Sequence, residues 1–218
     1  GYGGFTSRVT SRVAVLNLRR LARRDRGLKL LAGLIGYLCG SVPFGYLYVR
    51  LFKGEDLTKI GSGRTGGTNS FRAAGLGVGV LTSFSDVLKG AAAVWLTRWL
   101  LGDAFGPALL PWGVAVAGVF AVVGHNWSLF LRFGGGAGTG PNVGWSAAIW
   151  PWIFPIAFLV MGGMLYFVGM ASVASLSMAV VTITIFAIRY ALGIDTTLAY
   201  LAGSIVAGLV VTWALRTP

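Results

Sequence analysis

"LLAGLIGYLCGSVPFGYLYV", residues 30–49, decides the class of fold, because twenty consecutive residues carry no charged side chain. A helix of about 20 apolar residues is long enough to cross the hydrocarbon core of a bilayer. The stretch therefore predicts a membrane span over about residues 30–50. The composition agrees, with 56% hydrophobic residues, 11% charged residues and a mean hydropathy of +0.77; soluble domains average about a quarter charged residues.

Further apolar runs follow the first. Five have spanning length and one is shorter; the long runs cover about residues 76–101, 107–124, 150–169, 172–191 and 196–215, and the short one covers about residues 140–149. We therefore expect an all-α polytopic integral membrane protein with six to seven transmembrane helices and an N-terminal basic amphipathic segment. The 34 glycines fit this class, since small residues let membrane helices pack closely. Packing faces are expected at Gly113 and Gly118, and at Gly203, Ala207 and Gly208.

The segment before the first span is strongly basic. Residues 1–29 hold eight of the eighteen Lys and Arg residues, against one acidic residue, Asp25. Arginine alternates with apolar residues, which predicts an amphipathic extension (1–29) on the membrane surface, followed by the membrane domain (30–218). The expected partners of residues 8–29 are anionic lipid headgroups or an acidic surface of another protein, such as a membrane-complex subunit. Nucleic acid is not expected, because the segment continues directly into a membrane span.

The loop after the first span is rich in groups that bind phosphate. It combines glycines, hydroxyl and amide side chains, and cations: Gly61, Gly63, Gly66, Gly67, Ser62, Thr68, Asn69, Lys59, Arg64 and Arg72. Backbone N–H groups exposed by glycine, together with hydroxyls and guanidinium groups, form anion sites. A phosphate site and a glycine-rich connection between helices both explain this pattern.

Two other polar stretches interrupt the apolar runs. Asp86 and Lys89 lie three residues apart inside a predicted span, so they share a helix face and are expected to form an intramembrane ion pair. The second stretch, "GHNWSLFLRFGGGAG" (124–138), contains the only histidine, His125, followed by three consecutive glycines. No lysine accompanies these glycines, although phosphate loops usually contain one.

Four motifs in order resemble those of one enzyme family: "GSVPFGYL" (40–47), "LTKIGSGRTGGTNSFRAAG" (57–75), "SDVLKG" (85–90) and "GHNWSLFLRFGGGAG" (124–138). They look like the bacterial PlsY-type acyl-phosphate:glycerol-3-phosphate acyltransferases, over about residues 36–175. The family pattern runs GS-x-P-x-G, GSGN-x-GATN-x-x-R, D-x-x-KG and GH-x-x-x-x-F-x-x-F-KGGKG. The resemblance implies a multi-pass enzyme of the bacterial cytoplasmic (inner) membrane. Such an enzyme transfers a fatty acyl group from acyl phosphate to glycerol 3-phosphate in phospholipid synthesis, without a cofactor.

The resemblance also implies roles for individual residues. It makes Ser62, Arg72 and His125 the candidate catalytic residues. The candidate phosphate- or substrate-binding residues are Gly61, Gly63, Arg64, Thr68, Asn69, Asn126, Gly134, Gly135, Gly136 and Ser172.

The departures from the family pattern fall on charge. The family's KGGKG is Gly134–Gly138 here, with Gly134 and Ala137 in place of the two lysines, and Arg64 stands where the family has asparagine. Tyr166 replaces a family arginine, and the family's RH-x-x-NI-x-RL tail is not matched by "WALRTP" (213–218). Because charge-assisted contacts to phosphate are strong, these departures predict impaired or lost catalysis. The alternative is a non-catalytic structural or lipid-binding subunit of a larger membrane complex.

Overall fold

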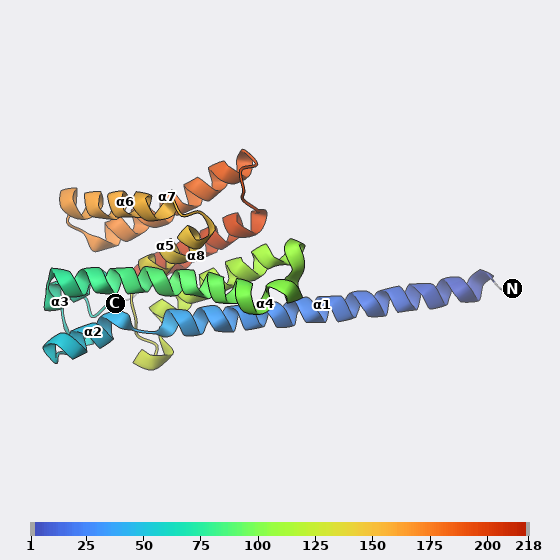
Figure 1. Cartoon of the computed structure of the whole chain (residues 1–218), viewed down its shortest axis with the longest axis horizontal. Coiled ribbons are helices and arrows are strands. Elements are labelled where there is room, and N and C mark those ends of the chain that lie inside the picture. Colours follow the sequence, from blue (N-terminus) through green and yellow to red (C-terminus); the bar gives the residue numbers. More distant parts are fainter. Residues whose placement is uncertain (1–2, 217–218) are drawn as a thin grey trace.

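The chain folds into helices joined by short loops. The computed structural model describes the backbone of residues 3–216 and the side chains of residues 21–216. Within this part of the chain there are eight α-helices and two short 3-10 helices (Figure 1). In order they are α1 (Gly3–Ser41), α2 (Phe44–Lys53), η1 (Leu57–Lys59), α3 (Gly67–Ala74), α4 (Leu76–Asn126), η2 (Leu129–Leu131), α5 (Thr139–Ile149), α6 (Ile153–Phe167), α7 (Ala171–Ala191) and α8 (Leu198–Arg216).

Helix α1 joins the predicted extension to the first predicted span. It runs from Gly3 to Ser41 without interruption, so no helix boundary falls at residue 30. The first break comes instead within the predicted span of residues 30–50, at Val42 and Pro43, since proline lacks the N–H group that would continue the hydrogen bonds of the helix. Most of the predicted amphipathic face falls on residues 1–20, whose side chains lie outside the described part. The domain boundary after residue 29 stays a prediction.

Helix α4 is bent into a hairpin and contains two of the predicted spans, 76–101 and 107–124. The bend is at Gly106, whose φ of 65° and ψ of 173° are not helical, and Pro107 follows it. The two halves run back along each other, so that the beginning and the end of α4 lie at the same end of the molecule (Figure 1). The loop between α2 and α3 and the loop after α4 are thereby brought together.

Four helical segments in the described part are long and apolar enough to cross a membrane. They are Leu21–Lys53, Leu76–Leu131, Ala171–Ala191 and Leu198–Arg216, and α6 is a shorter apolar helix. With α4 counted as two spans, these segments and α6 match the predicted long runs, and α5 occupies the shorter candidate near residues 140–149. The prediction of an all-α polytopic membrane protein is confirmed.

Glycine allows the helices to touch backbone to backbone. A Cβ atom at Gly36 or Gly40 of α1 would collide with the backbone of Ala117 or Ala121 in α4. The predicted packing faces are also real. Gly118 and Gly203 both lie against the indole of Trp145, which is fully buried and stacks on Phe186 of α7 with 5.9 Å between ring centroids. Gly113 packs on Phe105, and Gly208 packs on Ile183.

Candidate active site

A polar pocket of about 430 Å³ lies where the loop after α2 meets the loop after α4. We call it the loop pocket, and its lining residues are Thr58, Lys59, Gly61, Ser62, Gly63, Arg64, Gly134 and Gly135. The two loops are joined directly, because the backbone N–H of Thr65 donates to the carbonyl oxygen of Gly135 at 3.3 Å. Segments about seventy residues apart in the sequence thus form one site, as a consequence of the bend in α4.

The buried side chain of Asn69 holds the first loop in shape. Its Nδ2 donates to the carbonyl oxygens of Ile60 at 2.8 Å and Arg64 at 2.9 Å, and its Oδ1 accepts from the N–H of Ser62 at 3.3 Å. The sequence suggested Asn69 as a substrate ligand. These bonds commit both ends of its amide to the loop, so the contacts of Asn69 are those of a positioning residue.

Two cationic side chains, Lys59 and Arg64, line the loop pocket, and they contact different groups. The side chain of Lys59 is 81% exposed and lies 3.9 Å from the carboxylate of Asp56. The guanidinium of Arg64 reaches the end of α8, where its Nη2 donates to the carbonyl oxygen of Ala214 at 3.0 Å. A guanidinium at this position complements the negative end of the helix dipole and donates to a carbonyl oxygen of the last turn. Arg64 therefore ties the pocket to the C-terminal end of α8.

Side chains of both charge signs lie at the loop pocket. The hydroxyl of Thr58 donates to the carboxylate of Asp56 at 2.6 Å, and this bond lowers the pKa of the Asp56 carboxyl. Burial lowers the pKa of the Arg64 guanidinium, which nevertheless stays protonated at neutral pH. At neutral pH the described pocket thus combines two cations with one neighbouring carboxylate.

Three glycines of the second loop are required by close packing against the end of α4. A Cβ atom at Gly135 would collide with the carbonyl oxygen of His125, and one at Gly136 would collide with the His125 imidazole. Gly138 has a φ of 82° and its Cβ would lie 2.6 Å from Oδ1 of Asn126. The N–H of Gly136 also donates to the carbonyl oxygen of His125 at 3.0 Å. The loop is thus built on the last turn of α4.

The two other positions of this loop, 134 and 137, are less crowded. A Cβ atom at Gly134 would have a single close neighbour, the carbonyl oxygen of Leu131 at 3.2 Å, and Ala137 already has one. Positions 134 and 137 are those at which the PlsY-type pattern has lysine. The loop therefore lacks the two charges of the lysine-bearing pattern.

A buried charged group lies behind this loop. Nζ of Lys89 is 2.7 Å from Oδ1 of Asp86 and donates to the carbonyl oxygen of Val42 at 2.8 Å, which ties α4 to the break between α1 and α2. Nδ1 of His125 lies 3.6 Å from the same Asp86 oxygen, and all three side chains are 4% exposed. His125 thus lies behind the glycine loop and is not among the residues that line the pocket.

The other predicted site residues lie outside the lining of the loop pocket. Arg72 is exposed on α3, and Thr68 is half-buried in the first turn of that helix. Asn126 is buried at the end of α4, and Ser172 is exposed at the start of α7. Their roles stay predictions, as do the roles of the residues that line the pocket.

Sequence reasoning missed two participants. Thr58 lines the pocket, and Thr65 joins the loops through its N–H group. The signal for Thr58 was the spacing from Asp56, whose carboxylate caps η1 by accepting from the Thr58 N–H at 3.0 Å. No comparable signal marks Thr65, whose partner lies in another loop. Among the described residues, no cluster of three or more His, Cys, Asp or Glu side chains could hold a metal ion.

Known proteins resemble this chain along most of its length. The family model described as glycerol-3-phosphate acyltransferase matches residues 30–217. A glycerol-3-phosphate acyltransferase of Rubrobacter xylanophilus is 39% identical over 189 residues, which cover 87% of this chain and 88% of the relative. Another, of Synechococcus sp. (strain JA-3-3Ab), is 37% identical over 187 residues, which cover 86% of each chain.

Solved structures share the fold. A crystal structure of PlsY (YgiH), an integral membrane glycerol 3-phosphate acyltransferase, in its glycerol 3-phosphate form, is 30% identical and has a TM-score of 0.72. The match covers 86% of this chain and 88% of that chain. Its lysophosphatidic acid form gives a TM-score of 0.70 with the same coverage.

Proposed function

Since the chain belongs to the glycerol-3-phosphate acyltransferase family, we propose that its loop pocket binds the phosphate of glycerol 3-phosphate and that acyl transfer there is impaired. The protein is an integral multi-pass membrane protein, like bacterial PlsY. One observation carries the proposal: Gly134 and Ala137, which stand where the family pattern has lysine, bring no charge to the glycine loop.

The pocket offers the groups that a phosphate monoester needs. Gly61 and Gly135 line it with backbone N–H groups that make no hydrogen bond within the described structure, Ser62 supplies a hydroxyl, and Lys59 supplies a cation. Asn69 and the bond from Thr65 to Gly135 fix these donors before a ligand arrives, which lowers the cost of ordering them on binding. The pocket is therefore suited to one phosphorylated headgroup.

The proposed reaction brings two anionic groups together. The hydroxyl of glycerol 3-phosphate attacks the carbonyl carbon of the acyl phosphate, the carbon–oxygen bond to phosphate breaks, and the hydroxyl proton leaves with the released phosphate. Negative charge develops on the carbonyl oxygen and on the departing phosphate, so cations and N–H donors aimed at these atoms lower the barrier. His125 and Asp86 support this site from behind the glycine loop, as positioning residues.

The missing lysines set the expected size of the defect. A hydrogen bond to a charged group contributes about 1.5–3 kcal/mol. The loss of two such contacts to phosphate lowers kcat/KM by about 10²–10⁴-fold relative to a lysine-bearing enzyme. Arg64 does not replace them in this structure, because its guanidinium contacts the end of α8.

Restoring the lysines tests the proposal. The purified full chain is incubated with acyl phosphate and labelled glycerol 3-phosphate, and lysophosphatidic acid is measured for the natural chain, for Ser62→Ala and for Gly134→Lys/Ala137→Lys. We expect the double variant to raise kcat/KM at least about tenfold. Leu129→Lys is the matched control, since this side chain is 50% exposed in the same loop and does not line the pocket.

Two results would overturn the proposal. The first is a natural chain as active as the Rubrobacter xylanophilus relative, with no gain in the double variant. The second is calorimetry that shows no binding of glycerol 3-phosphate to the natural chain or to the double variant. A non-catalytic role in a membrane complex stays a prediction.

A further inference from the structure

An apolar groove of about 540 Å³ runs along α1 on the side of its contact with α4. Its apolar lining comes from Leu30, Gly33, Leu34 and Tyr37 of α1 and from Val116 and Phe120 of α4, and Arg26 and Lys29 close one end. We propose that this groove binds one anionic phospholipid, with an acyl chain along the apolar residues and the headgroup phosphate at Arg26 and Lys29. Such a site is separate from acyl transfer in the loop pocket.

The basic end of the groove lies far from the loop pocket. Arg24 donates to the carbonyl oxygen of Ala104, 3.3 Å away and two residues before the Gly106 bend of α4. The other end of the groove is at Tyr37. The Tyr37 hydroxyl donates to the carbonyl oxygen of Trp127, just after α4, at 3.0 Å. The arginine end of the groove and the loop pocket therefore lie at opposite ends of the helix bundle.

Length fits the proposal. Arg26 and Tyr37 are eleven residues apart on one helix, which corresponds to about 16 Å at the helical rise of 1.5 Å per residue. The hydrocarbon core of a bilayer is about 30 Å thick, so the groove is about one leaflet deep. Leu30 and Leu34 are 75% and 53% exposed, so the groove is open toward the surrounding lipid.

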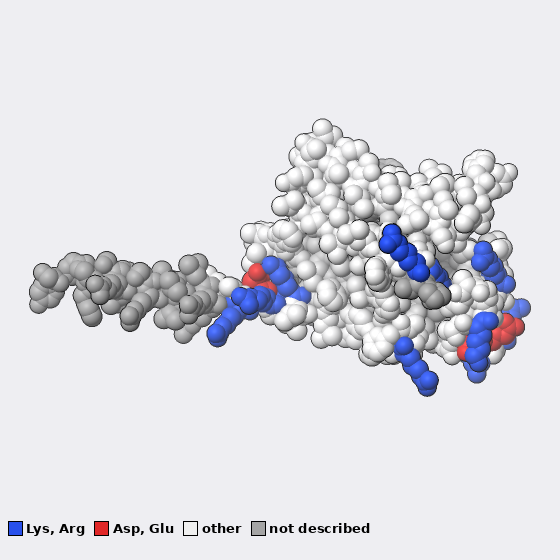
Figure 2. All heavy atoms as spheres, turned by 180° about the vertical axis from the view of Figure 1, so that it is seen from behind, with Lys and Arg blue, Asp and Glu red and all other residues white. Residues whose placement is uncertain are grey.

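Charge favours an anionic headgroup. No charged residue follows Lys29 until Arg50, so Arg26 and Lys29 are the last charges before the apolar run, where long basic side chains reach the headgroups. Asp25 pairs with Lys29 at 2.8 Å, and Arg23, Arg24 and Arg26 leave the neighbourhood positively charged. Figure 2 shows one group of basic side chains at this end of the bundle and others over its opposite half, with a stretch of uncharged surface between the two groups.

Basic residues at both ends of the helix bundle require a partner that neutralises one of the two ends. The positive-inside rule can be met by only one of two basic ends that lie on different sides of a membrane. The family match begins at residue 30, so Arg26 and Lys29 lie outside it. A bound anionic lipid neutralises the basic end that this chain has before the family match.

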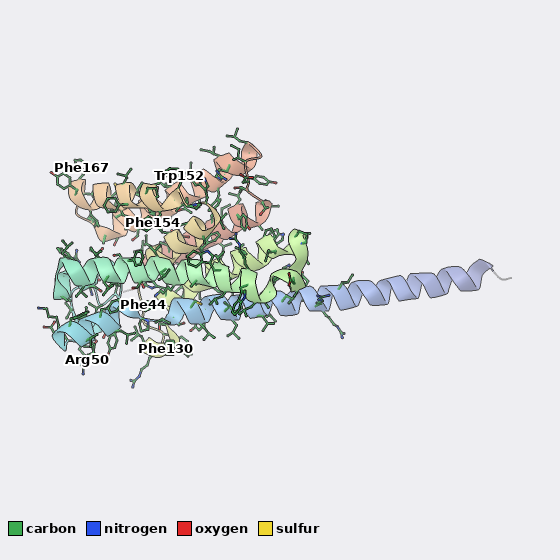
Figure 3. All side chains as sticks on the ribbon, in the orientation of Figure 1. Phe44, Arg50, Phe130, Trp152, Phe154 and Phe167 are labelled. Atoms are coloured by element: carbon green, nitrogen blue, oxygen red, sulfur yellow. The ribbon has the colours of Figure 1, made fainter. Side chains whose placement is uncertain are left out.

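Native mass spectrometry of the full chain in detergent tests the proposal. The protein is mixed with equal amounts of phosphatidylglycerol and phosphatidylcholine that have the same acyl chains, and the retained lipids are counted. We expect the natural chain to retain several-fold more phosphatidylglycerol, and Arg26→Ala/Lys29→Ala to lose at least about four-fifths of that preference. The matched control is Arg50→Ala, because Arg50 lies on α2 at the far end of the bundle (Figure 3).

A second variant distinguishes the effect of the groove from the effect of charge. Leu34→Trp fills the groove from an exposed position without changing charge, and we expect it to reduce phosphatidylglycerol retention as well. Melting temperatures in phosphatidylcholine that equal those of the natural chain show that these variants are folded. Equal retention of the two lipids by the natural chain, full retention by either groove variant, or release of the lipid by inorganic phosphate overturns the proposal.

Discussion

The N–H of Thr65 donates to the carbonyl oxygen of Gly135 at 3.3 Å, and this bond makes two distant loops into one pocket. Thr65 precedes α3, whereas Gly135 follows α4, so the bond closes over a complete helical hairpin. Each loop is in turn held from behind, the first by Asn69 and the second by His125. The pocket therefore depends on residues that do not line it.

Replacement of Asn69 by alanine is expected to loosen the first loop. The variant loses four hydrogen bonds to the loop backbone, which contribute about 2–4 kcal/mol together. We expect a lower melting temperature and faster proteolysis between Leu57 and Arg64. Asn69→Asp keeps the acceptor for the Ser62 N–H but turns a buried carboxylate oxygen toward the loop carbonyls, and should destabilise the loop at least as much as alanine. Unchanged proteolysis in Asn69→Ala would contradict this role.

Alanine at Gly136 is expected to displace the glycine loop, because its Cβ would enter the His125 imidazole. Such overpacking costs about 1–3 kcal/mol. The control is Gly134→Ala, whose Cβ has one close neighbour at 3.2 Å. Thermal unfolding and binding of glycerol 3-phosphate should change in Gly136→Ala and change little in Gly134→Ala. Equal effects of the two substitutions would disprove the packing argument.

The buried pair of Asp86 and Lys89 is expected to be more sensitive to single than to double replacement. Removal of one partner leaves an uncompensated buried charge and costs about 3–5 kcal/mol, whereas removal of both can be nearly neutral. A double-mutant cycle with Asp86→Asn and Lys89→Met, read by thermal unfolding in detergent, measures the coupling. If the two single effects simply add in the double variant, the pair does not stabilise the protein.

Replacement of Arg64 by glutamine is expected to loosen the last turn of α8. The lost bond to the Ala214 carbonyl oxygen and the lost complement to the helix dipole amount to about 1 kcal/mol. Hydrogen exchange at the last-turn amides of α8 should accelerate by about fivefold. The control is Lys53→Ala, which removes an exposed cation at the end of α2 and should leave these amides unchanged. Acceleration in both variants would mean that total charge, and not this contact, matters.

The sequence alone predicts most of the fold, because the bilayer imposes a length on each apolar run. The break expected between residues 101 and 107 coincides with the bend at Gly106, where glycine adopts a positive φ. Pro43 interrupts the first span, and this break was not expected. The continuation of α1 through residue 30 was also not expected, since the composition changes there while the helical backbone does not.

The site was less predictable, since its contacts join residues that are far apart in the chain. Motif order indicated the two loops of the pocket, and the spacing of Asp86 and Lys89 placed them on one face. The distance between Arg64 and the end of α8 is 150 residues in sequence, and no local pattern encodes such a contact. The position of His125 behind the glycines likewise depends on how the loop after α4 folds back, and so does the contact between α1 and α4 that forms the apolar groove.

The hairpin of α4 also determines which aqueous compartment each part of the chain meets. Arg24 contacts the carbonyl oxygen of Ala104 near the bend, whereas Arg64 contacts Ala214 beside the loop pocket. In a sealed vesicle, a fluorophore at Leu21 and one at Arg216 will therefore be quenched from opposite sides by an impermeant quencher. Under the proposed function, the compartment that supplies glycerol 3-phosphate is the one in which the second label responds.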